Sequence, residues 1–524
     1  MRYLVSALVA TASFALSVQT APTPQIGGEP SGPEINNANI PGEPTGPVGS
    51  SGNRYGSESL LGPGSAQAGS SSPTENVPYT PVANQAANPT LGMYLDFSKS
   101  ENPQPIRGSN GATDPGPRTY NYDRINSDLV ARPGTDMGDV ANAKWPMGLS
   151  SSRSGTGKNS GWARQANTDE LPIATAMAGV DMRLAPNAYR ELHWHSANEW
   201  SYILNGSVRI SAVNQNGESF VDDLTAGDLW FFPAGVPHSI QATEEGVEFL
   251  LVFNQGGFSE DDTDLVSELF ARNPREVLAK NFQTDISDFD NIPTEQKYIF
   301  NGTPMPSNLT EVRQNITGPA GSLPQNQSYS YHFSQQEPYT VPGGSVKIVD
   351  PTTFPIANNF SVGLFTIEPG AMREIHWHLT SDEWNFFLSG QARVTVFAGP
   401  QNSRTFDFSA GDVGYIPVSD SHYVENTGTE PVTYLEILQA PKYSDMSAGQ
   451  WLGLTPAQVV KDTLNLPQSL IDRLPKTKQY IVPGNANLST TNFTVDSYPN
   501  ANLNAQKRDA RKTPYGFTRP SGLD

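Results

Sequence analysis

A histidine pattern that occurs twice constrains this chain more than any other feature of its sequence. The two copies consist of His193, His195, Glu199 and His238, and of His376, His378, Glu383 and His422. The second copy follows the first by 183 residues at its first two histidines and by 184 at its glutamate and last histidine. The chain has 7 histidines, and all but one of them belong to these copies. The repetition predicts two related domains in tandem.

Each copy combines three imidazoles with one carboxylate, a ligand set that suits Mn, Fe, Cu or Zn. In octahedral coordination such a set leaves two neighbouring positions open for a small ligand. The chain contains no cysteine, which excludes disulfides, thiolate metal sites and cysteine nucleophiles. We therefore predict one metal centre per domain, and an enzyme.

The residues around these ligands show the patterns of β-strands. Histidines two positions apart share one face of a strand. The one-residue difference between the copies falls between the second histidine and the glutamate, where a continuous strand would turn the glutamate to the other face. We therefore expect a loop at that point. Asn205-Gly206 predicts a hairpin with a primed-type turn.

The remaining turns and strands are short and regular, which is typical of a β-sandwich or barrel. Helices are expected only near residues 263–273 and 455–464. The predicted fold class is thus all-β, with two tandem barrels and a few short helices.

An arginine precedes the first histidine of each copy by three residues, at Arg190 and Arg373. Strand alternation alone would place it on the opposite face, so a local bend must bring it to the ligands. A buried guanidinium can hold a carboxylate by charge-assisted hydrogen bonds. It would also supply the local positive charge that a chain of net charge -20 otherwise lacks.

Composition divides the chain into five segments. An apolar run after Arg2 predicts a secretory signal peptide over residues 1–20. Residues 21–95 are rich in Pro, Gly and Ser and are expected to be a disordered linker. The two domains then span residues 96–325 and 326–485, and residues 486–524 form a low-complexity tail. The basic run at 507–512 within that tail is expected to be solvated.

The negative charge makes nucleic acid and anionic membranes poor partners. The signal peptide and the sequons clustered between residues 301 and 328 predict a secreted, extracellular glycoprotein, with cell-wall association as an alternative. The sequence leaves a homo-oligomer open.

The motifs as a whole resemble the cupin family. The pattern G-x5-H-x-H-x3,4-E-x6-G fits both copies, with Gly206 and Gly390 at its end. The pattern G-x5-P-x-G-x2-H fits residues 227–238, and it fits residues 411–422 except that Ser419 replaces the second glycine. From about residue 103 to residue 483 the chain resembles the bicupin oxalate decarboxylases. Its two ends look like those of the secreted fungal members.

The resemblance implies two cupin barrels of the double-stranded β-helix, or jelly-roll, type. It implies two Mn ions, one per domain, dioxygen as co-catalyst, and conversion of oxalate to formate and carbon dioxide. Arg190 would polarise the substrate and Glu260, on a segment similar to the family's mobile lid, would transfer the proton. Glu436 resembles the carboxylate near the second metal, and it stands 14 residues after His422, where the first half has Val252.

Three alternatives remain at this point. An oxalate oxidase would yield hydrogen peroxide and carbon dioxide. A secreted quercetinase-type bicupin dioxygenase would use copper and a flavonoid, and the paired arginines argue against it. A non-enzymatic, seed-storage-like bicupin would have lost ligands, whereas both sets are complete here.

Overall fold

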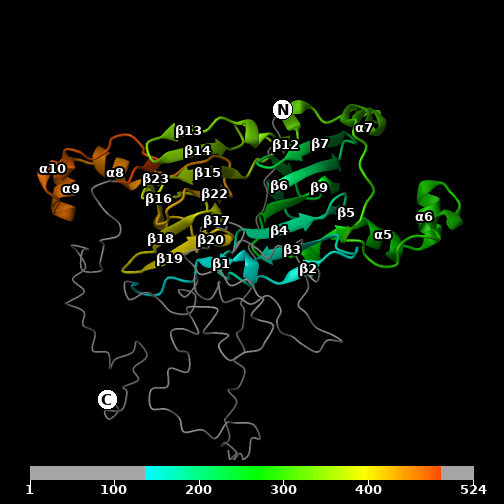
Figure 1. Cartoon of the computed structure of the whole chain (residues 1–524), viewed down its shortest axis with the longest axis horizontal. Coiled ribbons are helices and arrows are strands. Elements are labelled where there is room, and N and C mark those ends of the chain that lie inside the picture. Colours follow the sequence, from blue (N-terminus) through cyan, green and yellow to red (C-terminus); the bar gives the residue numbers. More distant parts are fainter. Residues whose placement is uncertain (1–135, 485–524) are drawn as a thin grey trace, which may run out of the picture. The chain divides into compact units, whose positions relative to one another are not determined.

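The computed structural model describes residues 136–484, which are built mostly of β-strands (Figure 1). This confirms the predicted all-β class. The predicted signal peptide (1–20), linker (21–95) and tail (486–524) lie outside the described residues, as does the start of the predicted first domain.

The strands of the first repeat belong to one sheet whose main path runs β12-β8-β6-β9-β4-β3-β2. The long strands β6 and β9 pair with each other in antiparallel fashion, and β5 pairs with β9, β10 and β11. The strand bounds are β2 Ser152–Ser154, β3 Gly161–Ala166, β4 Ala178–Leu184, β5 Tyr189–Trp194, β6 Glu199–Val213, β7 Ser219–Thr225, β8 Leu229–Phe232, β9 His238–Phe253, β10 Asp264–Leu265, β11 Ile299–Phe300 and β12 Ser330–Tyr331.

The second repeat forms two sheets, β1-β20-β17-β22-β15-β14-β13 and β19-β18-β21-β16-β23, with β24 on β16. Apolar residues of both sheets, such as Phe365 and Val394, meet in one buried cluster, as a jelly-roll requires. The strand bounds are β1 Lys144–Pro146, β13 Tyr339–Val341, β14 Gly344–Val349, β15 Ser361–Ile367, β16 Met372–Trp377, β17 Glu383–Ser389, β18 Gln391–Phe397, β19 Ser403–Ser409, β20 Asp412–Ile416, β21 Ser421–Asn426, β22 Val432–Leu438, β23 Met446–Ser447 and β24 Ile481–Val482.

The predicted hairpin at Asn205-Gly206 is wrong. β6 continues through both residues, and its two halves pair with β9 instead of with each other. Gly206 does adopt a left-handed φ of 78°, but this conformation bends a single strand. A Cβ atom there would lie 2.1 Å from the carbonyl oxygen of Gly246 on β9, so the bend requires glycine. The Asn-Gly pair does change the direction of the chain. The pairing of β6 with β9 makes this change a bend within one strand and not a hairpin turn.

The two repeats exchange their N-terminal arms. β1 precedes the first repeat and pairs with β20 of the second, while β12 precedes the second repeat and pairs with β8 of the first. Each Gly-Asp turn of the cupin pattern binds one arm. Lys144 Nζ lies 3.5 Å from Asp412 Oδ2, and Ser334 Oγ donates to Asp228 Oδ1 at 2.6 Å. Each barrel in space therefore includes a segment that the sequence assigns to the other domain.

A shared apolar core joins the barrels. Side chains of the first repeat, such as Trp200 and Leu250, and of the second, such as Trp384 and Leu435, belong to one buried cluster. Gly179 allows this contact, because a Cβ atom there would lie 2.2 Å from the Trp384 ring. Burial of a large apolar side chain stabilises by about 1.5–3 kcal/mol, so the cluster makes the two barrels one folded unit.

Short helices lie outside the strands of each repeat (Figure 1). The predicted helical regions contain α5 and α9, and the other helices were not predicted. The α-helices are α5 Val266–Arg272, α6 Arg275–Phe282, α7 Leu309–Ile316, α8 Ala448–Leu454, α9 Ala457–Leu464 and α10 Gln468–Ile471. The 3₁₀ helices are η4 Met147–Leu149, η5 Glu260–Asp262, η6 Ile286–Phe289, η7 Gln325–Gln327 and η8 Phe333–Gln335. Within residues 136–484, no helix combines the length and apolar character needed to cross a membrane.

Candidate metal centres

Equivalent strands carry equivalent candidate ligands in the two barrels. The first histidine of each set lies on β5 or β16, and the glutamate begins β6 or β17. Residues 195–198 and 378–382 lie between these strands, so the expected loop exists and absorbs the one-residue difference. The last histidine lies on β9 or β21, directly opposite the first across the strand pair. Three strands thus bring each set together.

All the candidate ligands are buried, and within each set one ligand atom of every residue lies within 4.8 Å of the others. In the first centre, Glu199 Oε2 lies 3.0 Å from His195 Nε2 and 3.5 Å from His238 Nε2. In the second centre, Glu383 Oε2 lies 2.8 Å from Nε2 of both His378 and His422.

Backbone carbonyls fix the tautomer of every ring. The Nδ1 atoms of His193, His195 and His238 lie 2.6, 2.8 and 2.8 Å from carbonyl oxygens. Those of His376, His378 and His422 lie 2.7, 2.9 and 3.0 Å from carbonyl oxygens. A ring that donates its Nδ1–H to a carbonyl turns the lone pair of Nε2 inward, which is the arrangement of metal-binding histidines.

A cation fits between these inward lone pairs and the carboxylates. Both oxygens of Glu383 are buried, and neither makes a well-formed hydrogen bond within the described part of the chain, although Nε2 atoms lie 2.8 Å away. Lone pairs that face a carboxylate repel it unless a positive charge lies between them. The donor set, the burial and the tautomers therefore all suit a divalent metal.

The electrostatics favour the neutral form of the first histidine in each set. Burial, assisted by the positive charge of Arg190, holds the pKa of His193 well below its ordinary value, and burial does the same for His376. Burial would raise the pKa of Glu199, but the neighbouring His238 and His195 hold it below its usual range. His378 differs. Burial lowers its pKa, but the neighbouring carboxylates of Glu383 and Glu436 outweigh burial and raise its pKa to about 9. Two carboxylates compete for a positive charge at that point.

The predicted bend that turns the arginines inward exists. The register of β5 against β9 shifts between Arg190 and His193, and β16 shifts in the same way against β21. Arg190 is 1% exposed and Arg373 is fully buried. A β-bulge thus brings side chains that simple alternation would place outside onto the ligand side.

Glu260 is buried against Arg190 in the first barrel. Its Oε2 atom accepts hydrogen bonds from Arg190 Nη2 at 3.2 Å and from the Tyr298 hydroxyl at 3.1 Å. The Glu260 side chain is 6% exposed, whereas that of the next residue, Asp261, is 80% exposed and pairs with Arg153 at 2.8 Å. Glu260 is therefore the carboxylate of this segment that points inward, to the arginine three residues before His193.

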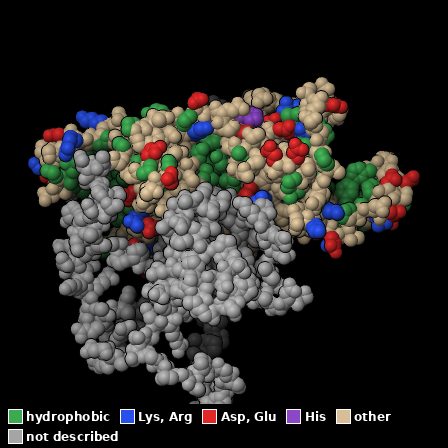
Figure 2. Space-filling model, viewed as in Figure 1, with side chains coloured by type: hydrophobic (Ala, Val, Ile, Leu, Met, Phe, Trp, Pro, Cys, Tyr) green, Lys and Arg blue, Asp and Glu red, His purple; other side chains and the backbone are tan. Residues whose placement is uncertain are grey.

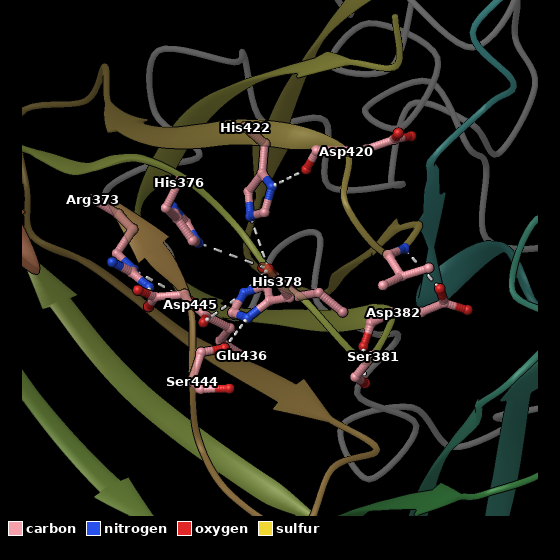
Figure 3. A network of polar contacts seen from close by, with 12 residues as sticks. Arg373, His376, His378, Ser381, Asp382, Asp420, His422, Glu436, Ser444 and Asp445 are labelled. Atoms are coloured by element: carbon pink, nitrogen blue, oxygen red, sulfur yellow. Dashed lines mark hydrogen bonds and ion pairs between the residues drawn. The ribbon is translucent and has the colours of Figure 1, made fainter. Parts of the chain in front are cut away.

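In the second centre Arg373 has two carboxylate partners (Figure 3). Its Nε atom lies 3.4 Å from Glu436 Oε2, and its Nη2 atom donates a hydrogen bond to Asp445. Glu436 also lies 3.2 Å from His378 Nε2 and accepts a hydrogen bond from Tyr443. This centre therefore already contains the negative charge that a bound carboxylate would bring.

The expected alignment of Glu436 with Val252 is wrong by one residue. Glu436 pairs with Asn385, the second residue after Glu383, and the corresponding pair in the first barrel is Ser201 with Leu251. The turn before β22 is one residue longer than its counterpart in β9, so equal distance from the last histidine misleads. The first centre thus has an apolar Leu251 where the second has Glu436.

Sequence reasoning missed Tyr298, Trp230 and Asp445. The Trp230 ring donates to Glu199 Oε1 at 2.7 Å, and the second barrel has Gly414 at the equivalent strand position. Tyr298 could have been found from the sequence, because its Tyr-Ile pair recurs 182 residues later, at Tyr480. Asp445 could not, because the connection between β22 and β23 (439–445) is three residues shorter than that between β9 and β10 (254–263).

Comparisons with known proteins agree with this geometry. The cupin family pattern matches residues 148–288 and again residues 331–470. The oxalate decarboxylase OxdC of Bacillus subtilis is 45% identical over 380 residues, which are 72% of this chain and 97% of that protein. A probable oxalate decarboxylase of Arthroderma benhamiae is 39% identical over 385 residues, with coverage of 72% and 93%.

Solved structures give the same result. The oxalate decarboxylase of Bacillus subtilis at pH 4.6 superposes with a TM-score of 0.66 at 45% identity, covering 73% of this chain and 98% of that one. Another structure of that enzyme, at the same TM-score and 44% identity, concerns its Mn(II) centres.

Proposed function

The chain belongs to the cupin family, as a two-domain relative of the oxalate decarboxylases, and on this basis we propose that it decarboxylates oxalate at its first metal centre. The observation that carries the proposal is the buried Glu260 carboxylate, which contacts Arg190 beside the three-histidine, one-glutamate set. In the reaction the oxalate monoanion loses carbon dioxide by cleavage of its C–C bond. The proton ends on the remaining carbon, which leaves as formate.

We propose Mn as the metal in both centres and dioxygen as co-catalyst. His193, His195, Glu199 and His238 would hold one ion, and the equivalent set in the second barrel would hold the other. When bound, the manganese and dioxygen supply the reversible one-electron oxidation that weakens the C–C bond of oxalate.

Arg190 would hold the substrate carboxyl that is not bound to the metal. Its Nη1 atom is buried and has no hydrogen-bond partner within residues 136–484, while Nη2 binds Glu260. The free N–H groups can therefore bind a second carboxylate without displacing Glu260. Leu251 stands where the second barrel has Glu436, so it brings no carboxylate to this position. The positive charge of the Arg190 guanidinium therefore stays available to the substrate.

Glu260 would take the proton from the bound monoanion and return it to the carbon that remains after carbon dioxide leaves. Tyr298 holds the same carboxylate oxygen that Arg190 holds, which keeps Glu260 oriented through both transfers. We assign turnover to the first centre, because Arg373 is already paired with Glu436 and Asp445 in the second.

The deciding experiment incubates purified, Mn-loaded protein with oxalate and measures formate and hydrogen peroxide together. A decarboxylase gives formate and carbon dioxide in equal amounts. Peroxide as the main product would make the protein an oxalate oxidase, and absence of both products would contradict activity on oxalate. Metal analysis in the same preparation separates Mn from the copper of a quercetinase-type enzyme.

We also propose that the protein is secreted and glycosylated. The predicted signal peptide supports secretion, and among the sequon residues Asn301, Asn315 and Asn326 are exposed. Mass spectrometry of the secreted protein before and after enzymatic deglycosylation tests both points.

A homo-oligomer is a further proposal. Apolar side chains remain exposed on the helical regions of both repeats, including Phe282 at 52% and Trp451 at 53%, and Figure 2 shows hydrophobic atoms at the surface there. Exposed apolar surface of this kind favours association with another copy. Light scattering of the purified protein measures the assembly state.

A further inference from the structure

The backbone of Glu260 is held from outside the barrel by two side chains of the β2–β3 hairpin. Its N–H donates to Gln165 Oε1 at 3.1 Å, and its carbonyl oxygen accepts from Arg153 Nη1 at 3.0 Å. β2 and β3 pair with each other, so the two grips share one support. The residue whose carboxylate contacts Arg190 is thus fixed through both of its backbone groups.

Arg153 makes three further contacts with the same region. Its guanidinium lies 3.8 Å from the centre of the Tyr298 ring, its Nη2 donates to Gln296 Oε1 at 2.9 Å, and its Nη1 lies 2.8 Å from Asp261 Oδ1. Tyr298 is also the residue that donates to the Glu260 carboxylate. One arginine therefore connects the outside of residues 259–262, here called the lid, to the tyrosine inside the site.

The second barrel has a comparable contact made from different residues. Ile299 pairs with Arg190 and Ile481 pairs with Arg373, so the preceding tyrosines, Tyr298 and Tyr480, are equivalent. Lys478 Nζ lies 4.7 Å from the centre of the Tyr480 ring and pairs with Asp445.

The position of Arg153 itself is not repeated in the second barrel. Arg153 pairs with Ala163 on β3, and the corresponding pair on β13 and β14 is Tyr339 with Val346. Both barrels thus place a cation over the equivalent tyrosine and beside one aspartate of the connection after the last long strand, from unrelated positions in the chain. A general packing role would not require the cation to recur in this way.

We propose that Arg153 is a positioning residue that latches the lid over the first centre and keeps Glu260 beside Arg190. Its effect on catalysis rests on the proposed function. With the latch open, Glu260 cannot return its proton to carbon, and the one-carbon fragment is oxidised instead. The balance of that branch is oxalate plus dioxygen plus two protons giving two carbon dioxide and one hydrogen peroxide, with dioxygen taking both electrons.

Lid opening can be measured without any assay of activity. The chain has no cysteine, and Thr263, the residue directly after the lid, is 9% exposed. In the Thr263→Cys protein loaded with Mn, a thiol reagent should react slowly. Adding Arg153→Met should raise the labelling rate roughly tenfold or more, the equivalent of one hydrogen bond to a charged group. Arg153→Lys should fall between the two, because it keeps the charge and loses the planar fork.

Arg275→Met is the matched control, since Arg275 also forms an ion pair in the first repeat, with Asp290 at 2.7 Å, away from the lid. It should leave labelling unchanged. If Arg153→Met protein does not fold, Gln296→Leu removes one partner of the guanidinium and should raise labelling by a smaller factor. Equal labelling in the Arg153 or Gln296 variants and the parent overturns the latch.

The catalytic consequence is measured in proteins that retain Thr263. Arg153→Met should increase the ratio of peroxide to formate and lower kcat for formate, with less change in KM, and Arg153→Lys should partly restore the ratio. An unchanged product ratio in a lid that opens faster overturns the positioning role. If the parent protein makes no formate from oxalate, the proposed function fails, and the labelling rates still decide whether the latch exists.

Discussion

Arg190 Nη2 lies 3.2 Å from Glu260 Oε2, and both side chains are almost fully buried. The bulge in β5 turns the arginine inward, and the lid brings the glutamate to it from a segment 70 residues away in the chain. A substrate carboxylate at this guanidinium would therefore lie beside the group proposed to transfer its proton. Binding and proton transfer are joined at one residue pair.

Replacing the lid carboxylate tests the proton transfer. Glu260→Gln keeps size and polarity but cannot carry a proton, so the rate of formate production should fall by roughly 10² to 10⁴-fold, the usual contribution of general acid–base catalysis. Residual turnover should shift toward peroxide, because that branch delivers no proton to carbon. Formate and peroxide assays on the same samples measure both effects.

The neighbouring residue provides the control. Asp261 is exposed and does not contact the candidate ligands, so Asp261→Asn should still produce mostly formate. Formate at the wild-type rate in Glu260→Gln, together with loss of formate in Asp261→Asn, would identify Asp261 as the acid.

Arg190→Lys tests substrate binding. Lysine keeps the charge but cannot hold Glu260 and a second carboxylate at once in the planar geometry of a guanidinium. We expect kcat/KM for oxalate to fall roughly tenfold to a hundredfold, the equivalent of one or two charged hydrogen bonds. Steady-state kinetics with metal content measured in parallel tests this. Unchanged kinetics at full metal content would exclude Arg190 from the binding site.

Metal analysis separates the two centres. His195→Ala should lower bound Mn to about one ion per chain and abolish turnover, because one of the four ligands of the first centre is lost. His378→Ala should also leave about one ion per chain but retain turnover, since the first centre stays intact. Activity that survives His195→Ala and disappears in His378→Ala would place catalysis in the second centre.

Much of the site could be predicted because its residues recur. The ligand sets, the loop before each glutamate and the bend at each arginine follow from comparing the two halves with the rules of strand geometry. Asp445 escaped prediction because the second-half connection that carries it has a different length. Glu436 was aligned with the wrong residue for the same reason, since a turn gained one residue between the last histidine and β22.

Features set by pairing between distant segments could not be read from local sequence. Asn205-Gly206 has the composition of a hairpin turn, and only the continuous pairing with β9 makes it a bend. The exchange of β1 and β12 between barrels has no local signal, because it depends on which strand edge each arm reaches. Arg153 was missed because its partners lie more than 100 residues away.

Asp181 predicts an unusual pH dependence of stability. Its carboxyl is fully buried opposite Arg164 on β3, and burial, only partly offset by Arg164 and Arg183, raises its pKa from 3.8 to about 7. Between these two pH values the unfolded chain releases a proton that the folded chain keeps, so this residue's contribution to stability falls as pH rises through that window. Asp181→Asn should therefore gain stability relative to wild type from pH 4 to pH 7, on the order of a few kcal/mol.

Denaturant unfolding at several pH values measures the difference, and Asp228→Asn is a control of opposite sign. Hydrogen bonds from Ser334, Thr225 and His332 outweigh burial and lower the pKa of Asp228. Its contribution is present above its ordinary pKa and is lost as pH falls through the lower folded value. The loss caused by Asp228→Asn should thus be largest near neutral pH, and a parallel response of the two variants would contradict the assignment for Asp181.

The exchanged arm predicts that one lysine of β1 stabilises the second barrel. Lys144 is fully buried, its ammonium faces Asp412, and it donates to the carbonyl oxygen of Asp407. Lys144→Met should lower the free energy of unfolding by about 3–5 kcal/mol, because it removes the cation that faces a buried carboxylate.

The double variant Lys144→Met/Asp412→Asn should lose less stability than the sum of the two single variants, since the pair is then removed together. Arg275→Met, which breaks an exposed pair, should cost less than about 1 kcal/mol. Urea unfolding of the four variants and the wild type gives these values, and strictly additive costs would mean that the arm binds the barrel without help from this ion pair.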